Sequence, residues 1–390
     1  MTPAARVQTA IELLDRILAG EPAERALTLW ARASRHAGSG DRAAVRDLVY
    51  DALRCQRSLA ARAGAAEPTG RALMIALAGP ADLDALFAGL PYGPSALEEA
   101  ERAALEAPGG EPPDPVRLDY PDWLDAPLRS ALGQAFEPVL AAMRDRAPVF
   151  LRVNLARGTR VEAMALLAAD GVECREAPSC DTALEVIGKS NKINGSRAYL
   201  QGLVELQDLS SQAAVADLPL ERGMKVLDYC AGGGGKALAM AARTGGRVDA
   251  HDANPGRTRD LPARAKRAGA ELRIVESAAL RPGAYDLVLV DAPCSGSGTW
   301  RRTPQSKWLL TPGRVADLVS LQRSILSTAA AHLRPGGTLA YMTCSLLDAE
   351  NDAVVAGFLG AQDGFSLSHE RRFLPTEGGD GFYLAVLSRS

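Results

Sequence analysis

The stretch VLDYCAGGGGK, residues 226–236, decides the fold of the C-terminal half of the chain. An apolar run ends at Asp228, four consecutive glycines follow, and a helical pattern begins at Lys236. Glycines let a backbone turn sharply and let a ligand approach without meeting a Cβ. The helix N-terminus beyond them favours a polar or anionic ligand group. Such a loop, after a strand, is the ligand-binding position of an open α/β sheet.

Two familiar glycine loops do not fit this stretch. A P-loop needs Ser or Thr after its lysine, and Ala237 follows Lys236. The glycines also lack the strict GxGxxG spacing, which disfavours a dinucleotide oxidoreductase. Asp252 ends the next expected strand, where an acidic side chain accepts hydrogen bonds from both ribose hydroxyls of a nucleoside. The alternative interpretation of Asp252 alone is an aspartate in a surface turn.

Strand and helix patterns alternate from about residue 223 to the C-terminus. Strands are expected at 225–230, 247–252, 272–276, 285–291 and 338–343, and helices at 236–243, 256–268, 313–333 and 348–359. This alternation predicts a mostly parallel sheet with helices on both faces. Two further segments, 364–368 and 381–387, are expected to add edge strands.

The rest of the chain has a different pattern. Apolar residues at helical spacing predict an all-α bundle near the N-terminus. Pro and Gly crowd the segment that follows and predict a linker. Strands are then expected at 150–154 and 183–187, with a helix at 161–169. The expected parts are a helical bundle at 1–107, a linker at 108–119, a small mixed α/β region at 120–215 and an α/β domain at 216–390.

Composition excludes several classes of protein. The chain has 390 residues, of which 47% are hydrophobic and 23% charged, with a net charge of −3. These values are ordinary for a globular protein and exclude disorder as the main state. No apolar run reaches the ~18 residues of a membrane helix, and no signal layout opens the chain, so we expect a cytoplasmic location without a membrane partner. Six irregularly spaced cysteines without CxxC, and four scattered histidines, predict neither a disulfide framework nor a metal site.

Two cysteines follow two of the expected strands. Cys294 lies in DAPCSGSG, directly after the strand at 285–291, and Cys344 lies in TCS, directly after the strand at 338–343. A lone cysteine is usually inert packing. Two of them at neighbouring strand ends, beside a glycine loop, point instead to a catalytic pair.

These segments resemble the RsmB/Sun family of RNA cytosine carbon-5 methyltransferases, closest to its bacterial 16S ribosomal RNA member. The resemblance rests on CAGGGGK, the strand end at Asp252, DAPCS with the following WRRTPQSKW, TCSLLDAEN and GDGFYLAVLSR. The N-terminal GDRAAVRDLVYDALR is similar to a NusB-like RNA-binding domain. The resemblance implies a Rossmann-like class I methyltransferase domain with a seven-stranded sheet, preceded by an all-α NusB-like domain and a small mixed α/β segment.

The resemblance also implies the roles of individual residues. Cys344 is the expected nucleophile, Cys294 the expected group for product release, and Asp291 the expected partner of the cytosine ring. S-adenosylmethionine is the implied cofactor, and its expected contacts are Cys230, Ala231, Gly232, Gly233, Gly234, Gly235, Lys236, Asp252 and Asp291. The expected contacts to RNA are Arg301, Arg302, Lys307 and Arg152.

Two departures from the family pattern concern the cofactor. The family reads CAAPGGK, whereas this chain has Gly232 and Gly233 in place of Ala and Pro. The family also has Asp near the cofactor adenine where this chain has Ala278, with Glu276 nearby as a substitute acceptor. Loss of the carboxylate at 278 predicts weaker recognition of the adenine amino group.

Alternative functions remain open at the level of the sequence. The expected partner is unfolded or partly assembled 16S ribosomal RNA, and the expected state is a monomer. Transfer RNA or another RNA is the alternative substrate for the same chemistry. A non-catalytic RNA-binding or ribosome assembly factor is the alternative from a different class, and Ala278 is its only support.

Overall fold

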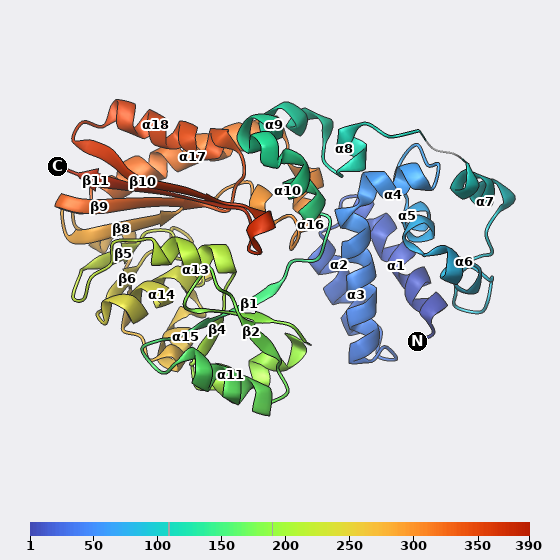
Figure 1. The fold of residues 1–390 in the computed structure, drawn as a ribbon, viewed down its shortest axis with the longest axis horizontal. Coiled ribbons are helices and arrows are strands. Elements are labelled where there is room, and N and C mark those ends of the chain that lie inside the picture. The colour runs from blue at the N-terminus through green and yellow to red at the C-terminus, as the bar shows by residue number, and fades with distance from the viewer. Residues whose placement is uncertain (108–109, 189) are drawn as a thin grey trace. The chain divides into compact units, whose positions relative to one another are not determined.

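The computed structural model describes residues 1–390 except 108, 109 and 189 (Figure 1). The chain forms two compact units. The first holds Met1–Arg146 together with Trp300–Leu309, and the second holds Ala147–Thr299 together with Leu310–Ser390. The first unit thus continues past the expected linker at 108–119, whose Pro108 and Gly109 lie outside the described residues.

The first unit is helical, as the sequence predicts. Its first helix begins because the Thr2 hydroxyl accepts a hydrogen bond from Ala5 N–H and Pro3 occupies the first helical turn. Val7, Ile11 and Leu14 then recur at helical spacing and are buried. The α-helices of this unit are α1 Pro3–Leu18, α2 Ala23–Ala33, α3 Ser39–Arg54, α4 Gln56–Arg62, α5 Gly70–Leu77, α6 Pro80–Leu86, α7 Glu99–Glu106, α8 Asp114–Arg117, α9 Asp125–Leu132, α10 Phe136–Ala142 and α16 Pro304–Leu309.

Helix α16 belongs to this unit although it follows the Cys294 loop in sequence. Trp308 Nε1 donates to Leu53 O at 2.8 Å, at the end of α3. Gln305 binds the start of α2, because its side chain accepts from Ala23 N at 2.8 Å and donates to Glu21 O at 2.9 Å. The segment 300–309 is therefore part of the helical core by its contacts rather than by its place in the sequence.

The second unit opens with a small antiparallel sheet. Its strands are β1 Val149–Val153, β2 Cys174–Glu176, β3 Ala183–Val186 and β4 Val204–Leu206, in the order β2-β3-β1-β4. Helices α11 Arg160–Ala169 and α12 Arg197–Leu200 accompany the sheet. The strands predicted at 150–154 and 183–187 and the helix predicted at 161–169 are confirmed. The three-residue strands β2 and β4 are too short to give a periodic signal in the sequence.

The main sheet has seven strands in the order β10-β11-β9-β8-β5-β6-β7. The pairs among β9, β8, β5, β6 and β7 are parallel, whereas β11 pairs antiparallel with β9 and β10. This confirms the predicted mostly parallel sheet. Of the two segments expected to add edge strands, β10 lies at the edge, whereas β11 lies between β10 and β9. The strands are β5 Val226–Asp228, β6 Val248–Ala250, β7 Leu272–Ile274, β8 Tyr285–Asp291, β9 Leu333–Thr343, β10 Phe365–Phe373 and β11 Phe382–Arg389.

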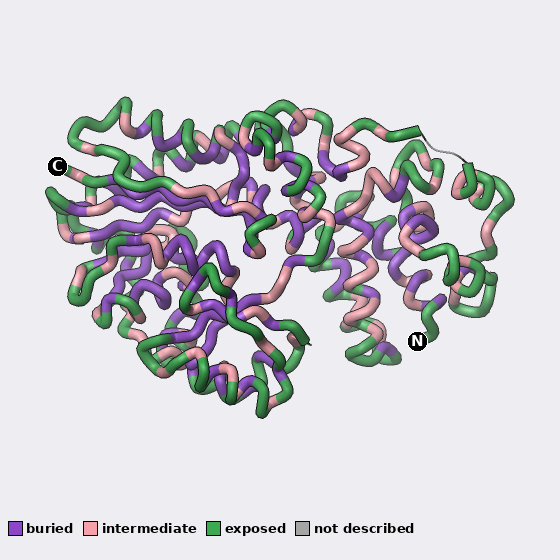
Figure 2. Tube along the Cα trace, in the orientation of Figure 1, coloured by how far each residue is buried: buried purple, intermediate pink, exposed green. Residues whose placement is uncertain are grey.

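Helices cover both faces of this sheet. Successive side chains of a strand point to opposite faces, so Leu287 and Leu289 of β8 join one core and Val288 and Val290 join the other. Figure 1 shows the first set of helices, α13–α15, on one side of the sheet and α17 and α18 on the other, and Figure 2 shows the buried strands between them. These helices are α13 Leu209–Ala216, α14 Gly235–Thr244, α15 Leu261–Ala268, α17 Pro312–Ala330 and α18 Asp352–Ala361.

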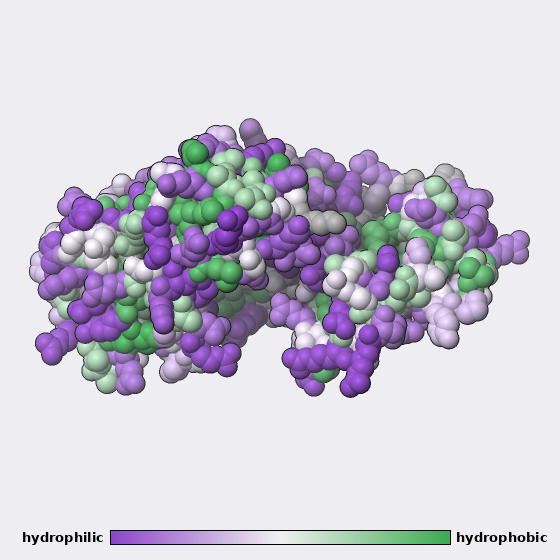
Figure 3. All heavy atoms as spheres, turned by 90° about the horizontal axis from the view of Figure 1, so that it is seen from below, coloured by the Kyte–Doolittle hydropathy of each residue, from purple (hydrophilic) through white to green (hydrophobic). Residues whose placement is uncertain are grey.

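Among the described residues, no helix combines the length and apolarity needed to cross a bilayer. The face drawn in Figure 3 is mostly hydrophilic, with apolar side chains in scattered groups.

Candidate active site

The predicted site residues of the α/β domain follow four neighbouring strands of the parallel sheet. The glycine loop follows β5, Asp252 follows β6, Asp291 ends β8, and Cys344 follows β9. Because the strand order places β9, β8, β5 and β6 side by side and parallel, their carboxyl ends share one sheet edge. The topology therefore assembles these side chains at one place.

The glycine loop has a shape that favours glycine at two of its positions. Gly232 and Gly234 have φ angles of +49° and +78°, in the left-handed region that glycine adopts without strain. A Cβ on Gly234 would lie 2.0 Å from Leu261 Cδ1. Helix α14 begins directly afterwards and points its free N–H groups out of the loop. The loop is thus a backbone cradle at a helix N-terminus.

Asp252 lies beside this cradle rather than in a surface turn. Its Oδ2 accepts from Gly232 N at 2.9 Å, and its Oδ1 accepts from Asn254 N at 2.9 Å. Arg257 lies 3.3 Å from Oδ2, and only 5% of the Asp252 side chain is exposed. The loop after β6 is therefore tied to the glycine loop, and the surface-turn interpretation is wrong.

Asp228, at the end of β5, is a site residue that the sequence analysis did not single out. It is 1% exposed, and neither carboxyl oxygen has a hydrogen-bond partner among the described residues. Burial and the nearby charge of Asp291 raise its pKa to about 7. An unpaired buried carboxyl is costly unless a ligand donates to it. The cradle and this carboxyl together suit a ligand that carries an amino group, as S-adenosylmethionine does.

Lys236 connects the glycine loop to Asp291. Its Nζ lies 2.7 Å from Asp291 Oδ2, and 12% of the lysine side chain is exposed against 32% for the aspartate. Burial alone would lower the lysine pKa, but the charge and hydrogen bond of Asp291 outweigh it, so the pKa is raised and the ammonium persists. The lysine thereby fixes one oxygen of Asp291 and leaves the other for a ligand.

The two cysteines meet at this edge. Cys294 Sγ lies 3.3 Å from Cys344 Sγ, both thiols are free, and both residues are partly exposed. The hydrogen bond with Cys344, followed by burial, raises the pKa of Cys294 well above its usual value. The loops that carry them pack backbone against backbone, since Gly298 N donates to Cys344 O at 2.9 Å. The expected pairing of two cysteines at strand ends is thus present in the geometry.

Three of the four residues expected to contact RNA are buried. Arg152, Arg301 and Lys307 are 5%, 4% and 2% exposed, so in this structure their side chains are not available to a phosphate group. This corrects the expectation for those three residues. Arg302 is partly exposed and remains a candidate contact.

The buried cations have internal partners. Arg152 donates to Gly235 O at 2.6 Å and to the Gln207 side chain, so it supports the glycine loop. Lys307 Nζ donates to Arg54 O at 3.1 Å, and burial lowers its pKa to about 8. Arg54 Nε in turn donates to Arg301 O at 2.7 Å. Sequence alone did not show this burial, because the partners are distant along the chain.

Ala278 lies where the sequence comparison expects the adenine-side acid. It is exposed in the short turn of helix Ser277–Ala279 after β7. His251 bridges this turn to β5, with Nδ1 2.7 Å from Tyr229 O and Nε2 2.8 Å from Ser277 Oγ. Glu276 is exposed beside it. The polar groups of this turn are thus a neutral hydroxyl and Glu276 rather than an acid at 278.

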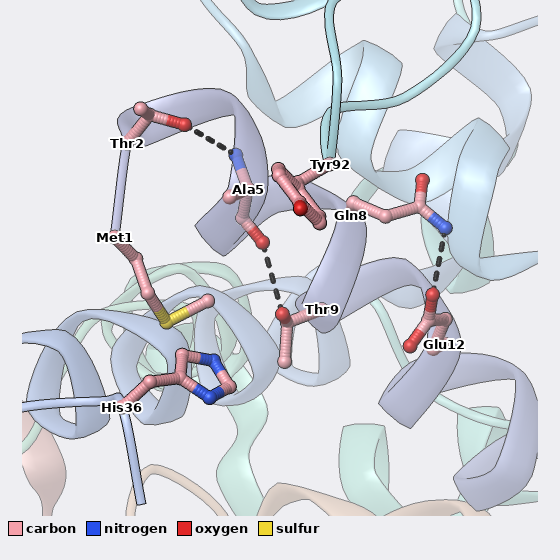
Figure 4. Close-up of a pocket in the computed structure, with 8 residues that line it drawn as sticks. All are labelled: Met1, Thr2, Ala5, Gln8, Thr9, Glu12, His36 and Tyr92. Carbon is pink, nitrogen blue, oxygen red and sulfur yellow. Dashed lines mark hydrogen bonds between the residues drawn. The ribbon is translucent and has the colours of Figure 1, made fainter. Parts of the chain in front are cut away.

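A separate cavity of about 650 Å³ lies in the helical unit (Figure 4). It is lined by Met1, Thr2, Ala5, Gln8, Thr9, Glu12, His36 and Tyr92. Polar side chains of α1 that line it already bond to one another, since Thr9 Oγ1 donates to Ala5 O at 2.9 Å and Gln8 donates to Glu12 at 2.9 Å. It contains none of the residues of the sheet edge, so we do not assign it to the candidate active site.

Comparison with known proteins gives two matches to family models. Residues 215–388 match a family described as 16S rRNA methyltransferase RsmB/F. Residues 120–191 match the ferredoxin-like domain of RsmF/B-like methyltransferases. The two matches cover the mixed region and the α/β domain.

Curated relatives carry the name ribosomal RNA small subunit methyltransferase B. The relative from Salmonella arizonae is 33% identical over 287 residues, which cover 70% of this chain and 67% of the relative. The relative from Klebsiella pneumoniae is 33% identical over 288 residues, covering 70% of this chain and 66% of the relative. The matched part therefore spans about two thirds of these relatives' length.

Solved structures share the fold. The crystal structure of PH0851 aligns over 100% of this chain and 99% of its own with a TM-score of 0.78 and 22% identity. A methyltransferase homologue from Pyrococcus horikoshii covers 71% of this chain and 98% of its own, with a TM-score of 0.62 and 24% identity. At these identities the likeness concerns the fold alone.

Proposed function

Because the chain belongs to the RsmB/F family of S-adenosylmethionine-dependent 16S ribosomal RNA methyltransferases, we propose that it methylates carbon 5 of a cytosine in ribosomal RNA through a covalent cysteine adduct. The observation that carries this proposal is the pair of thiols 3.3 Å apart at the sheet edge that also holds Asp291. Carbon 5 of cytosine is a poor nucleophile, and thiol addition to the neighbouring carbon is a direct way to activate it.

In the first step the Cys344 thiolate adds to carbon 6 of the base. A carbon–sulfur bond forms, and the electron pair of the 5,6 double bond becomes available at carbon 5. Asp291 hydrogen-bonds the ring N3 and the exocyclic amine and shares a proton with the base as addition proceeds. The bond from Lys236 Nζ to Asp291 Oδ2 orients the carboxyl for this contact.

The cofactor supplies the methyl group, and the chain offers a matching site for it. The glycine cradle at 230–236 and Asp252 lie beside one another, and the unpartnered Asp228 carboxyl suits the amino group. Arg152 holds the end of the cradle through Gly235 O at 2.6 Å.

Release of the product breaks the carbon–sulfur bond that formed in the first step. A base removes the proton from carbon 5, the double bond re-forms, and the electron pair of the carbon–sulfur bond returns to Cys344. Cys294 is the proposed group for this step, because its sulfur lies 3.3 Å from that of Cys344.

The proposed substrate is ribosomal RNA in an unfolded or partly assembled state. A base has to leave its stack to reach the sheet edge, and an unpaired base leaves most easily. Transfer RNA or another RNA stays the alternative substrate, and the monomeric state stays a prediction.

Nucleoside mass spectrometry tests the proposal directly. The protein is incubated with deproteinised 16S ribosomal RNA and S-adenosylmethionine, and the RNA is digested and analysed. We expect 5-methylcytosine with the wild-type protein and none with Cys344→Ala. A methyl group on a different atom, or equal methylation by both proteins, would reject the cysteine mechanism. Binding of RNA without any methylation would favour a non-catalytic assembly factor.

A further inference from the structure

A buried carboxylate lies directly behind the two cysteines and is used by none of the steps above. Glu350 ends the short turn of helix Asp348–Glu350, which follows β9 and the Cys344 loop. It is 0% exposed. The hydrogen bonds to its carboxylate in the described part of the chain all come from neutral donors. A charge held this way is unusual, because buried carboxylates are mostly paired with cations.

Donors to Glu350 come from both cysteine loops. Ser295, next to Cys294, donates its backbone N–H to Oε1 at 2.8 Å and its hydroxyl to Oε2 at 2.5 Å. Ser345, next to Cys344, donates its hydroxyl to the same Oε2 at 2.5 Å. Gln322 of α17 completes the set with a bond to Oε1 at 3.0 Å. These four bonds match the acceptor capacity of one carboxylate.

Further bonds stiffen the arrangement. Ser297 Oγ lies 3.1 Å from Ser345 Oγ and accepts from Leu346 N at 2.8 Å, so it links the same two loops. Tyr341 of β9 donates its hydroxyl to Glu350 O at 2.7 Å. The glutamate backbone is thus anchored to the sheet while its carboxylate holds the loops.

We infer that Glu350 is a positioning residue: by accepting hydrogen bonds from Ser295 and Ser345 at once, it fixes the two loops so that the sulfur atoms of Cys294 and Cys344 stay within contact of one another. The inference rests on the proposed function, because the proposed reaction is what requires the two cysteine sulfur atoms to stay in contact. It names a residue outside the cysteines and the cofactor loop on which the reaction depends.

The charge of Glu350 has a second effect on the pair. It adds to the Cys344 hydrogen bond and to burial in raising the pKa of Cys294. The charge thereby disfavours the thiolate form of Cys294, whose sulfur lies within hydrogen-bond distance of that of Cys344. The glutamate thus also acts on the protonation of Cys294.

Alkylation by iodoacetamide tests the inference without RNA or cofactor. Each cysteine is followed by peptide mass spectrometry across a pH series, because only the thiolate reacts. In Glu350→Gln we expect the midpoint for Cys294 to fall by about one pH unit, since a nearby negative charge is removed. The amide also cannot accept from both serine hydroxyls as well as from Ser295 N–H and Gln322, so methyl transfer should fall by about 100-fold.

Asp249→Asn is the matched control. Asp249 is also a buried carboxyl, 5% exposed, and accepts from Tyr285 OH at 2.8 Å and from Arg273. Its bonds do not reach the cysteine loops. We expect a loss of thermal stability comparable to that of Glu350→Gln, with an unchanged alkylation profile.

The outcomes separate the inference from the proposed function. An alkylation profile of folded Glu350→Gln that superimposes on that of the wild type would overturn the positioning role. If Glu350→Gln does not fold, Ser345→Ala cuts the link to the Cys344 loop only. It should still lower the midpoint for Cys294, because the hydrogen bond between the two sulfur atoms is weakened. An unchanged Cys294 profile in this variant overturns the role as well. If the profiles shift as expected but the wild type methylates no RNA, the positioning role stands and the proposed function fails.

Discussion

Lys236 Nζ and Asp291 Oδ2 are 2.7 Å apart, so the lysine that closes the glycine loop is bonded to the acid that ends the central strand β8. The lysine also lies 5.0 Å from the centre of the Phe382 ring, which adds a cation–π contact. A hydrogen bond therefore joins the glycine loop directly to the residue proposed to contact the base. A substitution of Lys236 should therefore lower the rate of methyl transfer and not only weaken ligand binding.

Lys236→Met removes the cation and keeps most of the side-chain volume. We expect the rate of methyl transfer to fall by about 100-fold, because Asp291 loses the group that orients it. Initial rates at saturating RNA measure this, with circular dichroism to confirm the folded fraction. Lys266→Met is the control, since Lys266 is an exposed lysine of α15, and its rate should stay within twofold of the wild type. Equal rates for the two variants would contradict the orienting role.

The two cysteine variants should fail in different ways. Cys344→Ala has no sulfur to add to carbon 6, so no covalent complex with RNA should form. Cys294→Ala still adds and methylates, but elimination should stall, leaving protein joined to RNA by a carbon–sulfur bond. Denaturing electrophoresis after incubation with RNA and S-adenosylmethionine distinguishes them by a retarded band. A retarded band with Cys344→Ala alone would reverse the two assignments.

Asp228 should make the stability of the unliganded protein depend on pH. Its pKa is about 7 in the fold against an ordinary 3.8, so the folded state holds the proton over this window while the unfolded state loses it. The free energy of unfolding therefore falls as pH rises from about 4 to 7, by at most about 1.4 kcal/mol per pH unit. Asp228→Asn removes this contribution, and its advantage over the wild type should grow with pH up to about 7.

Urea unfolding of both proteins at pH 4.5, 6 and 8 checks this dependence. The same substitution should weaken binding of S-adenosylmethionine in calorimetry, because the amide cannot balance a ligand ammonium. Parallel stability curves for the two proteins would show that Asp228 is ionised throughout.

Arg152 and Arg302 should differ in what they affect. Arg152→Ala removes the bond to Gly235 O, so we expect about 10-fold weaker binding of S-adenosylmethionine, in the range for a hydrogen bond to a charged group. Its salt dependence of RNA binding should match the wild type. Arg302→Ala should instead lower the slope of log affinity against log salt by about one, as loss of a phosphate contact does. Fluorescence anisotropy with labelled RNA at several salt concentrations compares them.

The local sequence was sufficient to predict the strands of the main sheet, but it was insufficient to predict which cationic side chains are buried. The apolar run at Tyr285–Asp291 was predicted with its correct ends, because a buried parallel strand has a dense and continuous signal. The role of Lys307 was misjudged, because its partner Arg54 lies 253 residues away along the chain. A basic segment beside the Cys294 loop favoured an RNA contact, and only the packing shows that Lys307 is buried. Asp228 and Glu350 were missed for the same reason, since a lone acid gives no sign of burial.

The capture of residues 300–309 by the helical unit has a consequence for the chain as a whole. The polypeptide passes between the two compact units after Arg146, after Thr299 and after Leu309. The helical unit is therefore built from two separate chain segments, and a single cut in the chain cannot remove it whole. Removing residues 1–146 would take away Arg54, whose carbonyl oxygen accepts a hydrogen bond from the buried Lys307 ammonium. Because the chain crosses between the units three times, we expect the two units to be inherited together rather than exchanged separately between proteins.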